Sequence, residues 1–263
     1  MVASEPTRRS AFLDLKAGIG ERNGRRKDRV AAFSGAGSST RENAMPLQNR
    51  VDPFGAIHAA PERGLFTGNR GIIHDPETKT LLKKRWTLPA WIICTCEYRD
   101  WRREPMGRNR PGGKTGWTEL FFLDEVTALA AGHRPCFFCR RDRATDFASR
   151  FGQAFDIEKP RAPMIDRRLH AERTASGGRL PFVTLDALGD LPDGTMIAAT
   201  QAVYALRAGN AHKWSFAGYS GPIPLDCLSG QQLRLVTPPT TVAVLREGFV
   251  PVWHPTVGAP VRR

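Results

Sequence analysis

The sequence predicts an α+β fold in two unlike parts: a small β-hairpin, helix and cysteine-turn module, and then a β-rich C-terminal domain. The first observation is the stretch 117–140, where an apolar strand end, a helix-forming run and a Cys-x-x-Cys pair follow one another. The second is the region after residue 181, where short apolar segments alternate with turn-forming Gly, Pro, Asn and Asp. We expect that region to form a barrel or a curled sheet.

Residues 117–140 carry the clearest local signals. Asp124 follows an aromatic strand end and is suited to cap a helix, because its carboxylate can accept backbone N–H bonds. An alanine-rich helix then ends at Gly132, where a left-handed residue is favoured. Pro135 prevents the helix from continuing, so Cys136 and Cys139 are expected on a tight turn.

The composition of the chain favours an anionic partner. Among 263 residues, Lys and Arg number 39 and Asp and Glu number 26, which gives a net charge of +13. Nucleic acid is the commonest partner of so basic a protein. No apolar run reaches the roughly 18 residues that a membrane span needs, and no signal-peptide core is present. We therefore expect a cytoplasmic protein, no membrane partner, and cysteines that serve as metal ligands or plain thiols.

The chain divides into four expected regions. Residues 1–44 are rich in Arg, Gly and Ser and are predicted to be a disordered basic extension, and we hypothesise that translation starts near Met45. The other regions are a cysteine-bearing module over 45–155, a linker with a short helix over 156–180, and the β-rich domain over 181–263.

Strands and helices outside the central stretch follow from periodicity. Residues 81–86 and 91–98 are β-branched or aromatic enough to predict strands, and on a regular strand Cys94 and Cys96 would share a face. Helices are predicted over 140–155, where apolar residues form one stripe, and over 165–173 and 240–247. The β-rich domain has predicted strands at 195–200, 202–207, 212–217 and 231–237.

The cysteines predict a zinc site. Two thiolates three residues apart on a turn can share one tetrahedral zinc, and thiolate is a soft ligand that suits this metal. Candidate ligands are Cys94, Cys96, Cys136 and Cys139, with His74 and His133 in reserve. The fifth cysteine, Cys227, stands alone and is expected to be a small buried side chain.

The stretch from Glu119 to Arg140 resembles the zinc module of the Ada methyl-phosphotriester repair family. The residues that carry the resemblance are the aromatic strand end, the helix and Arg134-Pro135-Cys136-x-x-Cys139, and a looser similarity reaches back to Trp91. The resemblance implies that 45–155 is an Ada-like zinc-stabilised module in which Cys136 and Cys139 bind zinc. It also implies DNA as the partner, DNA more than RNA, and a role in DNA repair or its regulation. The spacing of Cys94 and Cys96 differs from that of the family.

A basic loop lies between the expected ligands. We expect its cations to contact phosphates, with Trp101 and Trp117 near enough to stack on bases; a solvated hairpin loop is the other interpretation. These cations are Arg99, Arg102, Arg103, Arg108, Arg110 and Lys114. Gly113-Lys114-Thr115 is not a nucleotide-binding P-loop, because Arg108 stands where that motif needs glycine.

Two other functions remain open. His170 and Glu172, together with Cys136 and Cys139, contain the residue types of a zinc deaminase, although the order of the two motifs is reversed. On that hypothesis the protein is a zinc-dependent enzyme, deaminase-like or hydrolase-like, with His170 and Glu172 as catalytic residues. The last alternative is a zinc-stabilised module that binds other proteins.

Overall fold

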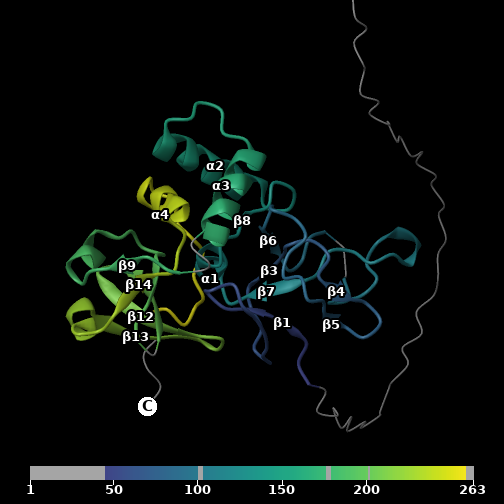
Figure 1. Cartoon of the computed structure of the whole chain (residues 1–263), viewed down its shortest axis with the longest axis horizontal. Helices are drawn as coiled ribbons and strands as arrows, with labels where there is room; N and C mark the ends of the chain where they lie inside the picture. Colours follow the sequence, from purple (N-terminus) through teal and green to yellow (C-terminus); the bar gives the residue numbers. More distant parts are fainter. Residues whose placement is uncertain (1–44, 100–102, 176–178, 201, 259–263) are drawn as a thin grey trace, which may run out of the picture. The chain divides into compact units, whose positions relative to one another are not determined.

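Four α-helices and three β-sheets make up the described part of the chain (Figure 1). The computed structural model describes residues 45–99, 103–175, 179–200 and 202–258. By its contacts the chain divides after Asn43, and residues 44–263 form one compact unit. The predicted extension over 1–44 lies outside the described residues.

The first sheet has six strands in the order β2-β1-β7-β3-β6-β8. Its strands are β1 (Gln48–Val51), β2 (Ile57–Ala59), β3 (Phe66–Asn69), β6 (Ile92–Thr95), β7 (Leu120–Phe122) and β8 (Arg134–Pro135). The central strand β3 is antiparallel to both neighbours, β6 and β7, while β8 is parallel to β6. A separate two-stranded sheet joins β4 (His74–Asp75) to β5 (Thr80–Leu81).

The second sheet also has six strands, in the order β13-β12-β11-β10-β14-β9. Its strands are β9 (Phe182–Val183), β10 (Met196–Ala198), β11 (Val203–Arg207), β12 (Asn210–Ser215), β13 (Gly218–Pro224) and β14 (Leu233–Leu235). All of its pairings are antiparallel, and β13 and β9 are its two edges. The sheet is therefore open, and the barrel alternative is wrong.

The helices are short except for two. They are α1 (Glu125–Ala130), α2 (Arg141–Phe155), α3 (Ala162–Thr174) and α4 (Pro239–Arg246), with 3-10 turns at Pro111–Gly113, Asp186–Asp190 and Leu225–Leu228. The helices predicted over 140–155, 165–173 and 240–247 are thus confirmed. None of the helices in the described ranges is long and apolar enough to cross a lipid bilayer.

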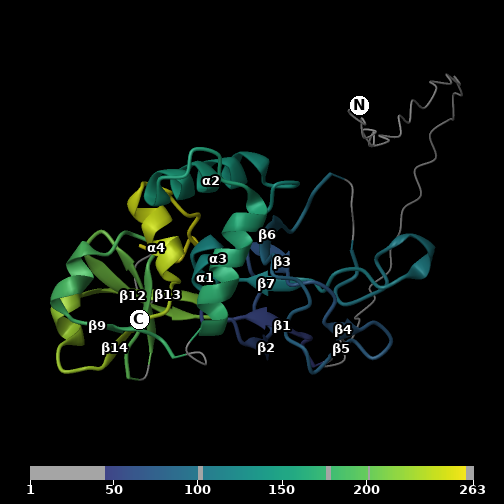
Figure 2. The same cartoon turned by 45° about the horizontal axis from the view of Figure 1, so that its top comes forward.

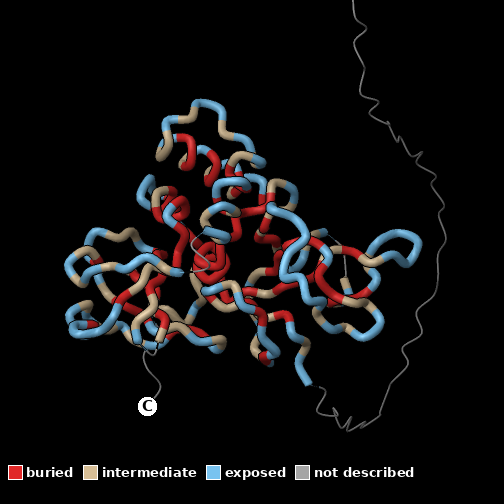
Figure 3. The backbone as a smooth tube through the Cα atoms, viewed as in Figure 1, coloured by how far each residue is buried: buried red, intermediate tan, exposed pale blue. Residues whose placement is uncertain are grey.

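Helix α1 lies between the two sheets, as both views show (Figures 1 and 2). All six of its residues are buried, which Figure 3 shows as a red coil at the centre. Leu129 packs into the core of the first sheet with α2, α3 and α4, whereas Val126 packs against the second sheet. Because α1 contributes to both cores, it holds in place strand β7, which precedes it, and the Cys-x-x-Cys turn, which follows it.

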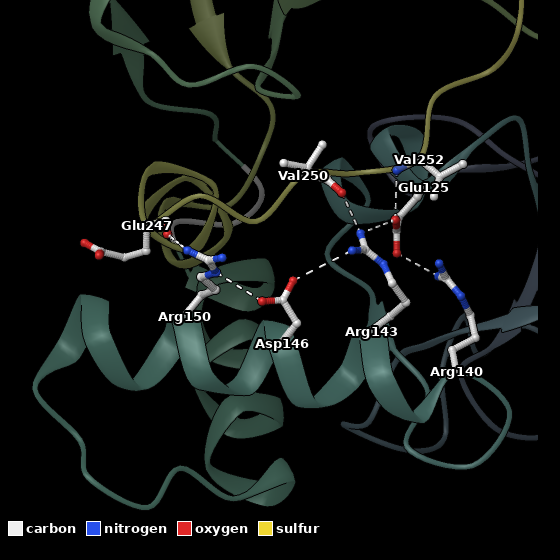
Figure 4. A network of polar contacts seen from close by, with 8 residues as sticks. All are labelled: Glu125, Arg140, Arg143, Asp146, Arg150, Glu247, Val250 and Val252. Carbon is white, nitrogen blue, oxygen red and sulfur yellow. Dashed lines mark hydrogen bonds and ion pairs between the residues drawn. The ribbon is translucent and has the colours of Figure 1, made fainter.

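A buried carboxylate fastens the start of α1 to α2 and to the C-terminal segment (Figure 4). Glu125 is fully buried; its Oε1 lies 2.7 Å from Nη1 of Arg140 and its Oε2 lies 3.0 Å from Nη2 of Arg143. The backbone N–H of Val252 donates to the same Oε2 at 2.9 Å. Arg143 also donates to the carbonyl of Val250. The residue directly after the Cys-x-x-Cys turn, Arg140, is therefore anchored in the interior.

Two local predictions need correction. The strand predicted over 81–86 is wrong beyond its start: β5 ends at Leu81, the N–H of Leu82 makes one more bond to Ile73 O, and residues 83–86 belong to no strand of the described sheets. Cys227 is exposed, not buried, because it lies on the 3-10 turn Leu225–Leu228, where Leu228 is the residue that points into the core.

Candidate metal centre

Three of the four predicted cysteine ligands meet at one point. The sulfur atoms of Cys94, Cys136 and Cys139 all lie within 4.8 Å of one another. Cys94 and Cys136 are buried, and Cys139 is partly exposed. A zinc ion about 2.3 Å from each sulfur needs sulfurs about 3.8 Å apart, so the group needs only small adjustments to close on a metal.

Main-chain bonds bring the cysteines together. Helix α1 ends as predicted: Asp124 accepts from the N–H of Thr127 at 2.8 Å, and Gly132 takes a left-handed φ of +80°. The reversed chain then pairs β8 with β6 in parallel. The N–H of Cys136 donates to Ile93 O at 2.9 Å, which places Cys136 beside Cys94, the next residue of β6. The turn that follows returns Cys139 to the same side.

The three cysteines differ in the pKa of their thiols. Hydrogen bonds from Cys139 and then from Cys94 lower the pKa of Cys136, and backbone N–H groups, including that of Phe138 at 3.4 Å, add to the effect. Hydrogen bonding to Cys136 raises the pKa of both Cys94 and Cys139; at Cys139 the hydrogen bond with Cys94, and then the backbone of Thr95, partly offset this. Among the three thiols, Cys136 therefore loses its proton most readily. Metal binding must displace the remaining protons.

The donor set fits zinc. Three sulfur ligands with backbone N–H groups directed at them suit a soft or borderline metal and exclude a hard one such as Mg²⁺ or Ca²⁺. Within the described residues, no fourth His, Cys, Asp or Glu joins the group. A fourth position on the metal would be left to a ligand from outside the chain.

That position can be reached from a cavity of about 410 Å³, called here the thiol cavity, which all three cysteines line. Four aromatic residues, Tyr98, Trp117, Phe121 and Phe138, line it as well. The thiols thus face a hollow with aromatic walls instead of closed protein interior.

Cys96 does not join the group. Strand β6 ends at Thr95, so the alternation that would have placed Cys96 beside Cys94 stops one residue too early. Its sulfur lies 3.5 Å from the carbonyl oxygen of Leu65, next to the end of β3, and the side chain is exposed.

The two reserve histidines are also separate from the thiols. His74 is buried, with Nδ1 2.7 Å from Oγ1 of Thr118. His133 is buried against Trp91, and its Nε2 accepts from Nε of Arg70 at 3.2 Å. Both histidines therefore hold the structure around the first sheet.

The proposed catalytic pair lies apart from the cysteine group. The ring of His170 packs edge-on against Trp86 with 4.5 Å between centroids. Glu172 accepts hydrogen bonds from the N–H and the hydroxyl of Thr240 at the start of α4. Both positions belong to α3, whose buried face packs on the core, so His170 and Glu172 serve contacts between α3 and its neighbours.

Two cations of the basic loop are paired with acids. Arg103 donates from Nε to Glu119 at 2.7 Å and lies over the ring of Trp117 at 4.1 Å. Arg108 donates to Glu77 at 2.7 Å. Glu119 is buried and also accepts from the N–H of Met106. Arg103 and Arg108 therefore have structural partners.

The other cations of the loop remain candidates for phosphate contact. Arg99, Arg110 and Lys114 are exposed and form no ion pair within the ranges that the structure describes. Arg99 lies 5.2 Å from the ring centre of Tyr98. Arg102 lies outside the described residues, as does Trp101.

Sequence reasoning missed the walls of the cavity. No motif marks Tyr98 or Phe121, but Phe138 stands between two paired cysteines, and this is itself a signal of an apolar side chain beside a candidate metal site. Phe138 is 60% exposed. Arg50 and Arg63 line a neighbouring hollow together with Phe121, and no motif in the sequence indicates this.

Comparison with protein-family models, with curated proteins and with solved structures found no match for this chain. The resemblance to the Ada zinc module, carried by Arg134-Pro135-Cys136-x-x-Cys139, stays a prediction.

Proposed function

We propose that this protein binds one zinc ion through Cys94, Cys136 and Cys139 and binds nucleic acid, DNA in preference to RNA, with the surface around that ion. The observation that carries the proposal is the convergence of three thiols on one cavity with aromatic walls. Thiol groups that meet from β6 and from a Cys-x-x-Cys turn are the usual construction of a zinc site.

Zinc would stabilise this fold. Residues 94 and 136 come from segments that are far apart in the sequence, so a shared metal removes freedom from the unfolded chain and adds binding energy to the folded one. A zinc ion held by these three thiolates would supply a Lewis acid. The chain's own contribution is to orient three thiolates and to surround the open position with aromatic rings.

The nucleic-acid partner is supported by charge and by the sequence resemblance. The chain carries +13, and Arg99, Arg110 and Lys114 are exposed cations of the loop between Cys96 and Cys136. The resemblance to the Ada module, which acts on DNA, favours DNA and a role in repair or its regulation. Aromatic rings beside cations are the composition of surfaces that bind single strands.

A zinc-dependent enzyme is the second candidate, because three protein ligands with an open position is the arrangement of catalytic zinc. Glu119 is the carboxylate that lines the thiol cavity. It accepts hydrogen bonds from Arg103, Met106 and Asn109, so its oxygens are already occupied as acceptors. Zinc-dependent release of ammonia from cytidine or adenosine in a single strand would favour this candidate; no release over a long incubation would remove its deaminase form.

The binding experiment measures affinity of the zinc-loaded protein for a labelled DNA strand, its duplex and the RNA of the same sequence, over a range of salt concentrations. If phosphate contacts drive binding, log K falls linearly with log salt, with a slope of about −0.7 per contact for a single strand. The variant with Arg99, Arg110 and Lys114 all changed to Ala should have a shallower slope.

The matched control changes three other exposed cations, Lys159, Arg161 and Arg167, to Ala. It removes the same net charge from the segment around the start of α3. The control should keep nearly the wild-type slope. Absence of binding at low salt, affinity that does not depend on salt, or equal effects of the two triple variants would contradict the proposal.

A further inference from the structure

A second hollow adjoins the thiol cavity. It has a volume of about 470 Å³ and is called here the arginine cavity, because Arg50 and Arg63 line it. Cys96, Pro105 and Phe121 line both hollows. A ligand could therefore extend from one into the other past the ring of Phe121.

The thiol cavity suits a flat ring. Its aromatic walls include Tyr98 and Phe138, whose ring centres lie 5.1 Å apart. Asn69 lines the same cavity and is only 5% exposed. Its Oδ1 accepts from the N–H of Gly71 at 3.2 Å, while its Nδ2 makes no hydrogen bond within the described ranges. An aromatic ring with an acceptor on its edge would stack on the walls and use that amide.

The arginine cavity suits an anion. No Asp or Glu lines it, so the charges of Arg50 and Arg63 are not balanced by an acid in its walls. Arg50 is fixed in place: its Nε donates to Glu62 O, and its guanidinium lies 4.9 Å from the ring centre of Phe121. Arg63 is exposed and forms no ion pair among the described residues. Arginine is the side chain best suited to phosphate, because its donors match the oxygens.

We propose that the two cavities form one binding site for a nucleotide unit, with the base in the thiol cavity and the phosphate against Arg50 and Arg63. This rests on the proposed function and adds to it the class of ligand and two phosphate-binding residues outside the basic loop. Phe121 lies between the base and the phosphate positions, since it lines both cavities. The base would be unstacked from its neighbours, as in proteins that bind single strands.

The test compares three probes on zinc-loaded protein. They are an eight-nucleotide thymidine strand, a strand of equal length in which every position is abasic, and thymidine 5′-monophosphate. Phe138→Ala should weaken binding of the thymidine strand about 5- to 150-fold, the range expected for one lost stacking contact. Phe138→Ala should leave the affinity for the abasic strand unchanged, and Phe138→Tyr should bind the thymidine strand as tightly as wild type.

Arg63→Ala should weaken binding of both strands and make the salt slope shallower by about 0.7, the effect of one phosphate contact. The control is Arg167→Ala, which removes an exposed arginine on α3. It should change neither the affinity for the strands nor the salt slope. Zinc content near that of the wild type shows that each variant is folded around its metal.

The outcomes separate this inference from the proposed function. Salt-dependent binding in which Phe138→Ala and Arg63→Ala behave like wild type overturns the nucleotide site and leaves the function standing. If the strands do not bind at all, calorimetric titration with the mononucleotide tests the site directly. Binding that Arg63→Ala weakens supports a site for free nucleotides, and no heat at millimolar ligand overturns the site. If the mononucleotide binds as tightly as the strand, the site is one for free nucleotides instead of nucleic-acid strands.

Discussion

Asp166 accepts two parallel hydrogen bonds from the guanidinium of Arg134, from Nε to Oδ1 and from Nη2 to Oδ2, each 2.8 Å long. Both side chains are buried. The pair joins α3 to β8, two residues before Cys136, so it fixes the position from which the cysteine turn begins. Bidentate geometry of this kind is specific to arginine and carboxylate.

Breaking this pair should destabilise the protein strongly. Asp166→Asn leaves the charge of Arg134 buried without a counter-charge, and the free energy of unfolding should fall by about 3–5 kcal/mol. Urea unfolding at saturating zinc measures the change. Glu158→Gln, which alters a highly exposed carboxylate, should change stability by less than about 0.5 kcal/mol. Similar values for the two variants would show that the buried pair has no special role.

Gly68 should be irreplaceable in β3. A Cβ atom there would lie 2.1 Å from the carbonyl oxygen of Ile92 and 2.9 Å from a ring carbon of Phe122. Gly68→Ala therefore forces β3 away from β6, the strand that carries Cys94, and should cost about 3 kcal/mol and weaken zinc binding. Gly189→Ala is the matched control, because no atom lies within 4 Å of its added Cβ. Thermal unfolding and zinc titration of both variants give the comparison. If Gly68→Ala keeps the stability and zinc affinity of wild type, β3 and β6 pair less closely than described.

His133 should make the protein sensitive to acid. Burial, and then the charges of Arg70 and Arg173, hold its pKa well below 6.5 in the folded state. The unfolded chain takes up a proton below about pH 6.5 while the folded protein does not, so stability is complete above that pH and is lost as the pH falls. By pH 5.5 the loss from this residue should be about 1 kcal/mol.

The check is the free energy of unfolding at several pH values for wild type and His133→Gln. Glutamine can still accept the hydrogen bond from Arg70 but does not titrate. Other groups titrate equally in both proteins, so the difference between the two curves isolates His133. Parallel curves between pH 7 and pH 5.5 would show that His133 has the same pKa in the folded and unfolded states, which would contradict the prediction.

The sequence predicted best what depends on neighbouring residues. The cap at Asp124, the left-handed Gly132 and the Cys-x-x-Cys turn are local, and the structure has all three. The helix over 239–246 was predicted within one residue at each end. What periodicity could not indicate is that Val244 and Leu245 of this helix pack into the core of the first sheet.

Features that depend on distant partners were predicted poorly. Strand β13 was missed because Gly218–Pro224 contains glycine and proline, yet it pairs along β12. The residues 82–86 look like a strand but have no partner in the described sheets. At the candidate metal site, the choice between Cys94 and Cys96 depends on where β6 ends, and the pairing of β6 with β3 decides where that is. The arginine cavity is likewise a product of folding, since Arg50 and Arg63 precede the thiols by more than thirty residues in sequence.

The zinc content of single cysteine variants tests the central claim most directly. Wild type should hold one zinc per chain, and Cys94→Ser, Cys136→Ser and Cys139→Ser should each lose it or bind it far more weakly, because each removes one of only three thiolates. Cys96→Ser and Cys227→Ser are the controls and should keep one zinc per chain. Full zinc in Cys136→Ser, or loss of zinc from Cys96→Ser with retention in Cys94→Ser, would contradict this account of the site.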